Sequence, residues 1–284
     1  MIVLVTGAKG QLGQDVVKLL QSQQHEVHGL DRSQLDISNE AQVKDVVATI
    51  KPDAIIHCAA YTNVDAAEED VDTAYKINAL GTKYLAQAAS NIGAKMVNVS
   101  TDYVFDGSAT KPYEVDHETS PLGVYGETKL AGENFLIHHL EKHFIVRTAW
   151  VYGVYGNNFV KTMLRLGKER DELGVVSDQL GSPTYTVDLA KFLVELIQTE
   201  KYGIYHASNE GICSWYEFAV EIFKQAGMDT KVNPLTTEQF PRPAERPKYS
   251  VLSKAKIVEE GFTPMRDWKE ALSDFLTELK QHEN

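Results

Sequence analysis

The sequence predicts an α/β fold in which a doubly wound parallel sheet is followed by a smaller α/β lobe at the carboxyl end. Over the first 150 residues, short apolar runs alternate with amphipathic stretches of helical length, as in repeated βαβ units around a buried sheet. A Gly-rich turn follows the first apolar run, where a strand would lead into a helix. After Trp150 the alternation of apolar runs and amphipathic stretches becomes irregular, and clusters of Gly, Pro and polar residues predict loops.

Each predicted strand in the first part is a short apolar run. These runs lie at residues 2–6, 26–30, 54–58, 95–100 and 144–148. Helices are predicted between them at residues 11–24, 40–50, 70–92 and 122–141. Asp70 is a suitable acidic start for the third helix, and Pro121 lies where a helix tolerates a missing N–H. Two later helices, at 214–226 and 267–280, are each opened by a capping residue, Ser214 and Asp267.

Composition narrows the class of partner. With 284 residues, of which 43% are hydrophobic, the chain can bury a large core. A formal net charge of −12 argues against binding nucleic acid over a broad surface. Cys58 and Cys213 lack metal-like spacing and are expected to be buried free thiols, which fits a reducing cytoplasm. The amino terminus has neither a basic leader nor a long apolar run, so we expect a cytoplasmic protein with no membrane partner.

The Gly-rich turn has the spacing of a dinucleotide site. Gly7 and Gly10 permit a tight turn and close approach of a pyrophosphate to the backbone, and Gly13 lets the helix pack against the strand. Gln11 and Leu12 lie at the helix amino terminus, whose free N–H groups attract phosphate. An ordinary strand-to-helix turn is the alternative, but the position at the start of a βαβ unit favours a dinucleotide.

The end of the second strand predicts the choice of dinucleotide. Asp31 and Arg32 follow Gly13 at the distance where such folds contact the adenosine ribose. Asp31 suits the 2′-hydroxyl of NADH, whereas Arg32 suits the 2′-phosphate of NADPH. We therefore predict NADPH as the preferred cofactor, with NADH also usable. Residues 1–150 are accordingly predicted to form an NAD(P)-binding Rossmann domain on which 178–208 pack back, while 151–177 and 209–284 form a substrate-binding lobe.

Tyr125 and Lys129 are the candidate proton-donating pair. Four residues apart on a helix, they lie on the same face. An ammonium beside a phenol is expected to lower the pKa of the tyrosine toward the working pH, where a general acid is most effective. Upstream, the Thr101 hydroxyl at a strand end could hold a substrate carbonyl oxygen. In isolation, each could equally be an ordinary helix or strand residue.

Together these residues resemble the extended short-chain dehydrogenase/reductases. The resemblance rests on the Gly-rich turn, Asn78, Thr101, the pair Tyr125 and Lys129, and the run Ala59, Ala60, Tyr61 and Thr62. More narrowly, the chain is similar to the dTDP-4-dehydrorhamnose reductase family in residues 35–37, 59–65, 100–107, 147–153, 178–184, 246–247 and 250–252. The match covers nearly the whole chain and is loosest over its last forty residues.

The resemblance implies a reaction. It is the NADPH-dependent reduction of the C4 ketone of dTDP-6-deoxy-L-lyxo-4-hexulose to dTDP-L-rhamnose, a step in nucleotide-sugar and cell-surface polysaccharide biosynthesis. Tyr125 would protonate the developing alkoxide, Lys129 would tune Tyr125 and hold the ribose, and Thr101 would hydrogen-bond the oxygen.

The resemblance also implies binding residues. Asp36 and Ile37 would border the adenine, and the other expected cofactor contacts are Ala59, Ala60, Tyr61, Thr62, Asn78 and Ser100. Thr101, Asp102 and Trp150 would face the sugar. In the basic segment 242–248, Arg246 could pair with the nucleotide diphosphate. Some members of the family are homodimers bridged by Mg²⁺; the corresponding Asp15, Asp188 and Glu278 are expected to be exposed helix carboxylates, and no metal is assigned.

Two alternatives stay open. One is another nucleotide-sugar reductase, epimerase or dehydratase of the same fold; a dehydratase needs a second acidic group after Asp102, where this chain has Tyr103. The other is a non-catalytic NADP-binding regulatory subunit, similar to that of methionine adenosyltransferase. The intact set of Thr101, Tyr125 and Lys129 favours an enzyme, whereas the exact sugar and nucleotide base are left open.

Overall fold

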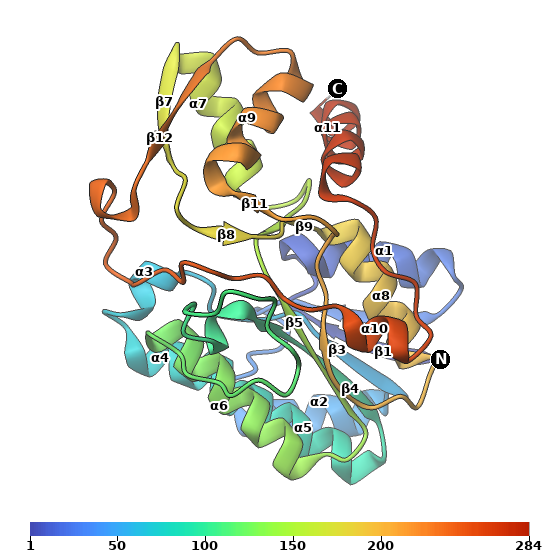
Figure 1. Ribbon diagram of the computed structural model, residues 1–284. Helices are drawn as coiled ribbons and strands as arrows, with labels where there is room; N and C mark the ends of the chain where they lie inside the picture. The colour runs from blue at the N-terminus through green and yellow to red at the C-terminus, as the bar shows by residue number, and fades with distance from the viewer. Residues whose placement is uncertain (284) are drawn as a thin grey trace.

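A six-stranded parallel sheet forms the centre of the protein, seen here in a computed structural model that describes residues 1–283 (Figure 1). Its strand order is β10-β5-β4-β3-β1-β2, and every neighbouring pair is parallel. The strands are β1 (Ile2–Thr6), β2 (Glu26–Leu30), β3 (Ala54–His57), β4 (Lys95–Thr101), β5 (His143–Thr148) and β10 (Gly203–His206). The order reverses beside β1, which confirms the doubly wound α/β fold.

Helices cover both faces of the sheet. On one face, α1 (Gln11–Ser22) and α8 (Thr186–Ile197) pack together over β1 and β4 through a shared apolar core. On the other face lie α2 (Glu40–Ile50), α5 (Gly81–Ile92) and α6 (Val124–His139). Because side chains alternate along a strand, β1 supplies Val3 and Val5 to the first core and Leu4 to the second.

The predicted elements are confirmed, with local differences at two helices. The stretch 70–92 begins as expected with Asp70, whose side chain accepts from Thr73 N at 3.3 Å. It then divides into α4 (Val71–Tyr75), a π-helical turn η1 (Lys76–Leu80) and α5. Helix α6 begins at Val124, where the carboxylate of Glu68, the residue that follows α3 (Val64–Ala67), accepts from Val124 N at 2.9 Å and satisfies a free N–H of the first turn.

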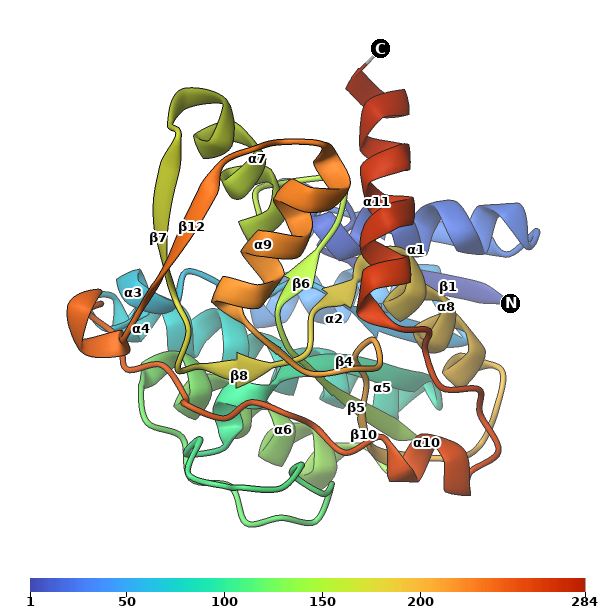
Figure 2. The same cartoon turned by 45° about the horizontal axis from the view of Figure 1, so that its top comes forward.

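A second lobe lies beyond the carboxyl ends of the strands (Figures 1 and 2). Its apolar core joins α7 (Phe159–Glu169), α9 (Trp215–Ala226) and α11 (Trp268–Glu283). The predicted cap of α9 is confirmed as a capping box between Ser214 and Glu217. Strand β7 (Glu172–Val176) pairs in parallel with β12 (Lys231–Leu235). Shorter elements complete the lobe and its connections: β6 (Val151–Tyr152), β8 (Leu180–Gly181), β9 (Thr184–Tyr185), β11 (Cys213–Ser214), η2 (Asp102–Val104), η3 (Thr237–Gln239) and α10 (Ala255–Glu259).

The sequence patterns did not reveal α7, α8, β7, β10 or β12. Helix α8 is buried on most sides, so it lacks the polar stripe by which an amphipathic helix is recognised. Strands β7 and β12 are distant in the sequence and pair only with each other. Their partners are therefore fixed by the fold of the second lobe.

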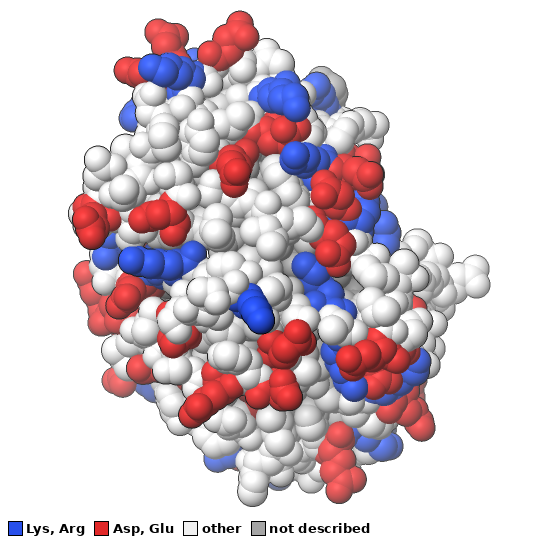
Figure 3. Space-filling view, in the orientation of Figure 1, with Lys and Arg blue, Asp and Glu red and all other residues white. Residues whose placement is uncertain are grey.

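The surface charge and the length of the helices bear on whether the protein could bind nucleic acid or cross a membrane. Acidic and basic side chains are intermixed on the face shown in Figure 3, without a broad basic area. Within residues 1–283, no helix combines the length and apolar character needed to cross a membrane. Both cysteines are free thiols; Cys213 is buried, as expected, whereas Cys58 is partly exposed.

Candidate functional site

The Gly-rich turn is shaped for close approach of a ligand. Gly7 has a φ of +66°, and a Cβ placed on it would lie 2.7 Å from the backbone nitrogen of Ala59. A Cβ on Gly13 would lie 2.2 Å from the carbonyl oxygen of Gly7. The turn therefore has no room for a side chain at Gly7 or Gly13, and it leads directly into the amino terminus of α1. This cradle fits the pyrophosphate of a dinucleotide.

Gln11 and Leu12 have other partners for their side chains. Gln11 joins the two lobes, because its amide donates to Val151 O at 3.2 Å and accepts from Asn158 Nδ2 at 2.8 Å. Leu12 is buried in the core. Both are thus placed to meet a cofactor through backbone groups.

At the end of β2, the Asp31 carboxylate is already engaged. It forms an ion pair with Lys9 of the Gly-rich turn and accepts from Ser33 N at 2.8 Å. The Lys9 and Ser33 interactions hold the pKa of Asp31 well below its ordinary value. Arg32 is exposed. Sequence reasoning missed Lys9, although its place inside the Gly-rich turn was a usable signal.

The expected adenine-side residues differ in exposure. Asp36 accepts from Ser38 N at 3.0 Å and is partly buried. Ile37 is buried, and its side chain fills the space that a Cβ on Gly81 would need. Asp36 is therefore the more accessible of the two.

Asn78 organises the loop after β3. Its side chain accepts from Tyr61 N at 2.8 Å and donates to Tyr61 O at 3.2 Å. It also lies 3.1 Å from the Thr128 hydroxyl on α6. Asn78 stands on the π-helical turn η1, a feature common at functional sites. It therefore holds the Ala59 to Thr62 loop against the helix that carries Tyr125.

Tyr125 and Lys129 share one face of α6; Lys129 is buried, whereas Tyr125 is half-buried. Burial raises the pKa of Tyr125 to about 12; the Thr101 hydroxyl opposes this rise, and Asp102 adds to it. The Lys129 ammonium donates to Val99 O at 2.7 Å. The expectation that Lys129 brings the pKa of Tyr125 toward neutrality is therefore wrong for this arrangement, because burial dominates.

Lys129 itself has a shifted pKa. Burial lowers its pKa to about 8, while Glu133 and Cys58 favour the charged form. Glu133, one turn further along α6, accepts from Arg147 Nη2 at 2.7 Å and from the Ser100 hydroxyl at 2.5 Å. The Ser100 hydroxyl is thereby turned into the protein, so a cofactor contact at this position would come from its backbone.

The end of β4 supplies a hydroxyl beside a buried carboxyl group. Thr101 Oγ1 donates to Asp102 Oδ1 at 3.0 Å, whereas Asp102 Oδ2 is buried without a hydrogen-bond partner. Burial raises the pKa of Asp102 to about 6. Tyr103 follows, and its ring meets that of Tyr125 edge to face at 5.4 Å. A buried acid with a raised pKa beside a hydroxyl is typical of a reactive site.

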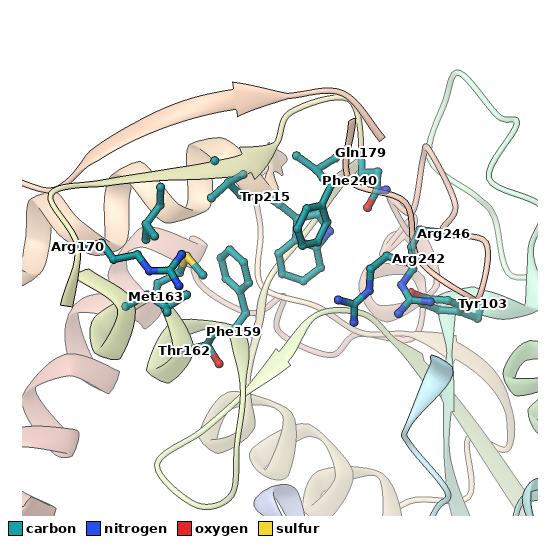
Figure 4. A pocket seen from close by; sticks show the side chains of 15 residues that line it. Tyr103, Phe159, Thr162, Met163, Arg170, Gln179, Trp215, Phe240, Arg242 and Arg246 are labelled. Carbon is teal, nitrogen blue, oxygen red and sulfur yellow. The ribbon is translucent and has the colours of Figure 1, made fainter. Parts of the chain in front are cut away.

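A cavity of about 540 Å³ opens from Tyr103 into the second lobe, and this size suits a small organic ligand (Figure 4). Its walls are mainly apolar and aromatic, with arginines at both ends; the lining residues include Tyr103, Phe159, Met163, Arg170, Trp215, Phe240, Arg242 and Arg246. No Asp or Glu of the described chain is among its lining residues. The cavity therefore favours a ligand with both apolar and anionic parts.

Trp150 has an aromatic partner in the second lobe, and its expected contact with the sugar stays a prediction. Its indole stacks on that of Trp215, with centroids 3.6 Å apart and planes 14° apart. Gly181 lies so close to Trp150 that a Cβ there would approach the indole to 2.6 Å. Trp215 lines the cavity, whereas Trp150 is not among its lining residues. Sequence reasoning missed Trp215. It is the first residue of a correctly predicted helix, and no local pattern marks it as a cavity residue.

Arg246 lines the cavity together with Arg242, and its contact with a diphosphate stays a prediction. Arg246 Nη2 is 3.0 Å from Asp65 Oδ1, and Arg242 Nη2 is 2.6 Å from Asp65 Oδ2. Figure 4 shows both arginines beside Tyr103, at the opposite end of the cavity from Arg170. The segment is therefore not a purely solvated loop.

The three carboxylates considered for Mg²⁺ have different surroundings from those expected. Asp15 and Asp188 are buried rather than exposed, and Glu278 accepts from the Tyr185 hydroxyl. Asp188 Oδ2 already accepts from Arg266 Nε at 2.9 Å. Over residues 1–283, no three His, Cys, Asp or Glu side chains are grouped to hold a metal ion. The carboxylates of one chain thus do not fit a metal site.

Comparison with known proteins gives a consistent set of relatives. Residues 1–281 match the family model described as RmlD substrate binding domain. The dTDP-4-dehydrorhamnose reductase of Aggregatibacter actinomycetemcomitans is 45% identical over 96% of this chain and 97% of its own. The spore coat polysaccharide biosynthesis protein SpsK of Bacillus subtilis is 45% identical over 97% of both chains. The crystal structure of dTDP-4-dehydrorhamnose reductase from Bacillus anthracis in complex with NADP is 49% identical, has a TM-score of 0.96, and covers 98% of this chain and 99% of that one.

Proposed function

This chain belongs to the RmlD substrate-binding-domain family, and from that membership we propose that it reduces the C4 ketone of dTDP-6-deoxy-L-lyxo-4-hexulose to dTDP-L-rhamnose with NADPH. One observation of the structure carries the proposal. Thr101, Tyr125 and Lys129 meet at the carboxyl edge of the sheet, and Tyr103 connects them to a cavity with arginines. In this proposal the proton donor lies between a dinucleotide cradle and a site for an anionic ligand.

Each catalytic side chain has a proposed task. When bound, the nicotinamide supplies a hydride to the sugar C4. Tyr125 gives its phenolic proton to the oxygen that becomes an alkoxide; its raised pKa keeps that proton in place at neutral pH. The Thr101 hydroxyl turns from Asp102 to the same oxygen and stabilises its growing charge. Lys129, whose ammonium donates to the Val99 carbonyl oxygen, supplies a positive charge next to Tyr125 on the same helix face.

The site has one acidic group beside Thr101, and this favours simple reduction over dehydration. Asp102 is the buried acid next to Thr101, and the following position holds the Tyr103 phenol. Removal of water would require a second acid or base at the sugar, and the described lining of the cavity provides no further carboxylate.

The preference for NADPH is supported by the cations around Asp31. Lys9 neutralises the Asp31 carboxylate that would otherwise repel a 2′-phosphate, and Arg32 is exposed beside it. The Bacillus anthracis relative is in complex with NADP. A cytoplasmic location, inferred from the two unpaired cysteines, and a homodimer, implied by the resemblance, are part of the same proposal.

The function can be tested by following NADPH absorbance with purified protein. We expect turnover of dTDP-6-deoxy-L-lyxo-4-hexulose and slower turnover of its D-xylo diastereomer, with NADPH used better than NADH. Dehydration of dTDP-glucose with NAD alone would instead indicate a dehydratase. A stable complex with another enzyme, combined with no ketone-dependent NADPH oxidation, would favour a regulatory subunit.

Lys129 predicts an alkaline limit to activity. Because its pKa is lowered to about 8, it loses its charge as the pH rises through that value. The kcat/KM for NADPH, which reports on the free enzyme, should therefore be constant below about pH 7 and fall above about pH 8. Lys129→Arg keeps its charge over this range and should shift the fall to higher pH, even if its rate is lower. An identical alkaline limb in both proteins would exclude Lys129 as its origin.

A further inference from the structure

The cavity is closed on one side by a segment with little regular structure. We refer to residues 236–248 as the strap; it follows β12 and contains only the short turn η3. The strap contributes Phe240, Arg242 and Arg246 to the cavity wall. Long arginine side chains on such a segment lose much conformational freedom on binding, unless other contacts already hold them.

Asp65 provides those contacts from the opposite lobe. It stands on α3, directly after the loop that Asn78 holds. Its Oδ1 accepts from Ala244 N at 3.2 Å and lies 3.0 Å from Arg246 Nη2; its Oδ2 accepts from Arg242 Nη2 at 2.6 Å. One carboxylate thus fixes the strap backbone and two guanidinium groups at once.

The charges favour a further anion at this place. Although burial raises it, the pKa of Asp65 is held below its ordinary value by Ala244 N and the two guanidinium groups. Asp65 is therefore ionised at neutral pH, and two cations against one anion leave a net positive charge. Only one terminal nitrogen of each arginine contacts Asp65. Arg246 Nη1 also donates to Ala244 O at 3.1 Å, so the donors that remain for an anion come mainly from Arg242 and from the second N–H of each Arg246 terminal nitrogen. The nucleotide diphosphate would bring the complementary negative charge.

The position also fits the chemistry of the site. Arg246 and Asp65 both act on the pKa of Tyr103, so they lie close to that phenol. Tyr103 in turn contacts Tyr125 at 5.4 Å. A diphosphate held by the arginines would therefore stand near the sugar that Tyr125 protonates.

We propose that Asp65 is a positioning residue that holds Arg242 and Arg246 as a preformed subsite for the substrate diphosphate. The inference rests on the proposed function, because it takes a nucleotide sugar as the ligand of the cavity. Asp65 acts through the two arginines and does not contact the reacting atoms. Its removal should weaken binding of the diphosphate and leave the proton transfer unchanged.

The test compares dTDP with thymidine, which lacks the diphosphate. In Asp65→Asn, the Kd of dTDP measured by calorimetry should rise about tenfold, the size expected for losing charge-assisted hydrogen bonds, while the affinity for thymidine stays the same. The KM for the ketone should rise similarly, with kcat within about twofold of the original value. The matched control is Glu69→Gln, which removes an exposed carboxylate near the same helix. It should leave the affinities for dTDP and for thymidine unchanged.

A double-mutant cycle identifies the route of the effect. Because Asp65 acts through the arginines, Asp65→Asn should weaken dTDP binding much less when Arg246→Gln is already present. Additive effects, or unchanged or tighter dTDP binding in Asp65→Asn, would overturn the proposal. Should Asp65→Asn fail to fold, Asp65→Glu replaces it: the carboxylate is displaced by one methylene, and the affinity for dTDP must still fall relative to thymidine.

Failure of the proposed role of Asp65 can be distinguished from failure of the proposed reaction. If the unmodified protein binds dTDP but reduces no dTDP-4-keto sugar, the proposed reaction fails while the calorimetric test of Asp65 still stands. If it reduces the ketone and Asp65→Asn behaves identically, only the role of Asp65 fails.

Discussion

Tyr125→Phe is expected to lower kcat by roughly two to four orders of magnitude, the usual contribution of a general acid. The substitution removes only the phenolic oxygen. The aromatic ring that packs edge to face on Tyr103 is kept, so the fold and the cavity should be preserved. Single-turnover measurement of NADPH oxidation with saturating ketone would isolate the chemical step from product release.

Ligand binding provides the control for this prediction. Tyr125→Phe should bind NADPH and dTDP with nearly the original affinity, because the diphosphate contacts lie at the arginines. Tyr84→Phe, on α5 and away from the cavity, should retain full activity. A Tyr125→Phe protein with unchanged kcat would remove Tyr125 from the reaction.

The second large effect concerns stability. Arg147→Met should destabilise the protein by about 3–5 kcal/mol, because it leaves the Glu133 carboxylate buried and without its counter-charge. Only 4% of the Arg147 side chain and 1% of the Glu133 side chain is exposed, and the pair is bidentate, with Arg147 Nε 3.0 Å from Glu133 Oε1 and Nη2 2.7 Å from Oε2. The midpoint of thermal unfolding should fall by roughly 6–20 °C in a protein of this size.

Two further variants separate charge from packing. Arg147→Met combined with Glu133→Gln removes both charges and should recover much of the lost stability, since no unpaired charge is left. Arg165→Met breaks the exposed pair with Glu169 on α7, whose side chains are 61% and 52% exposed, and should cost less than about 1 kcal/mol. If the double variant were as unstable as Arg147→Met, the loss would come from packing instead.

Much of the fold could be predicted from local patterns. The strands β1 and β2 and the helix α2 have the predicted bounds, because short apolar runs and an amphipathic stretch identify them without reference to the rest of the chain. The elements α8 and β10 were not recognised as such. Their residues are buried by contacts with α1 and β5, which are distant in the sequence, so their periodicity carries little information.

Some residues of the site could likewise be predicted from the sequence, and others could not. The Gly-rich turn, Thr101 and the pair Tyr125 and Lys129 could be found because each has a characteristic local spacing. Their electrostatics could not, since the pKa of Tyr125 depends on how deeply α6 is buried. Asp65 and Trp215 had no spacing that related them to their partners.

Local sequence patterns predict the strands and helices of residues 1–150, the dinucleotide turn and the residue types for carbonyl reduction, because these depend on neighbours within a few positions. Which tryptophan lines the cavity, which acid holds the arginines and which proton each buried group keeps became known only from the three-dimensional fold. Those properties depend on desolvation and on charges brought together from distant segments, and the spacing of residues along a chain does not record them.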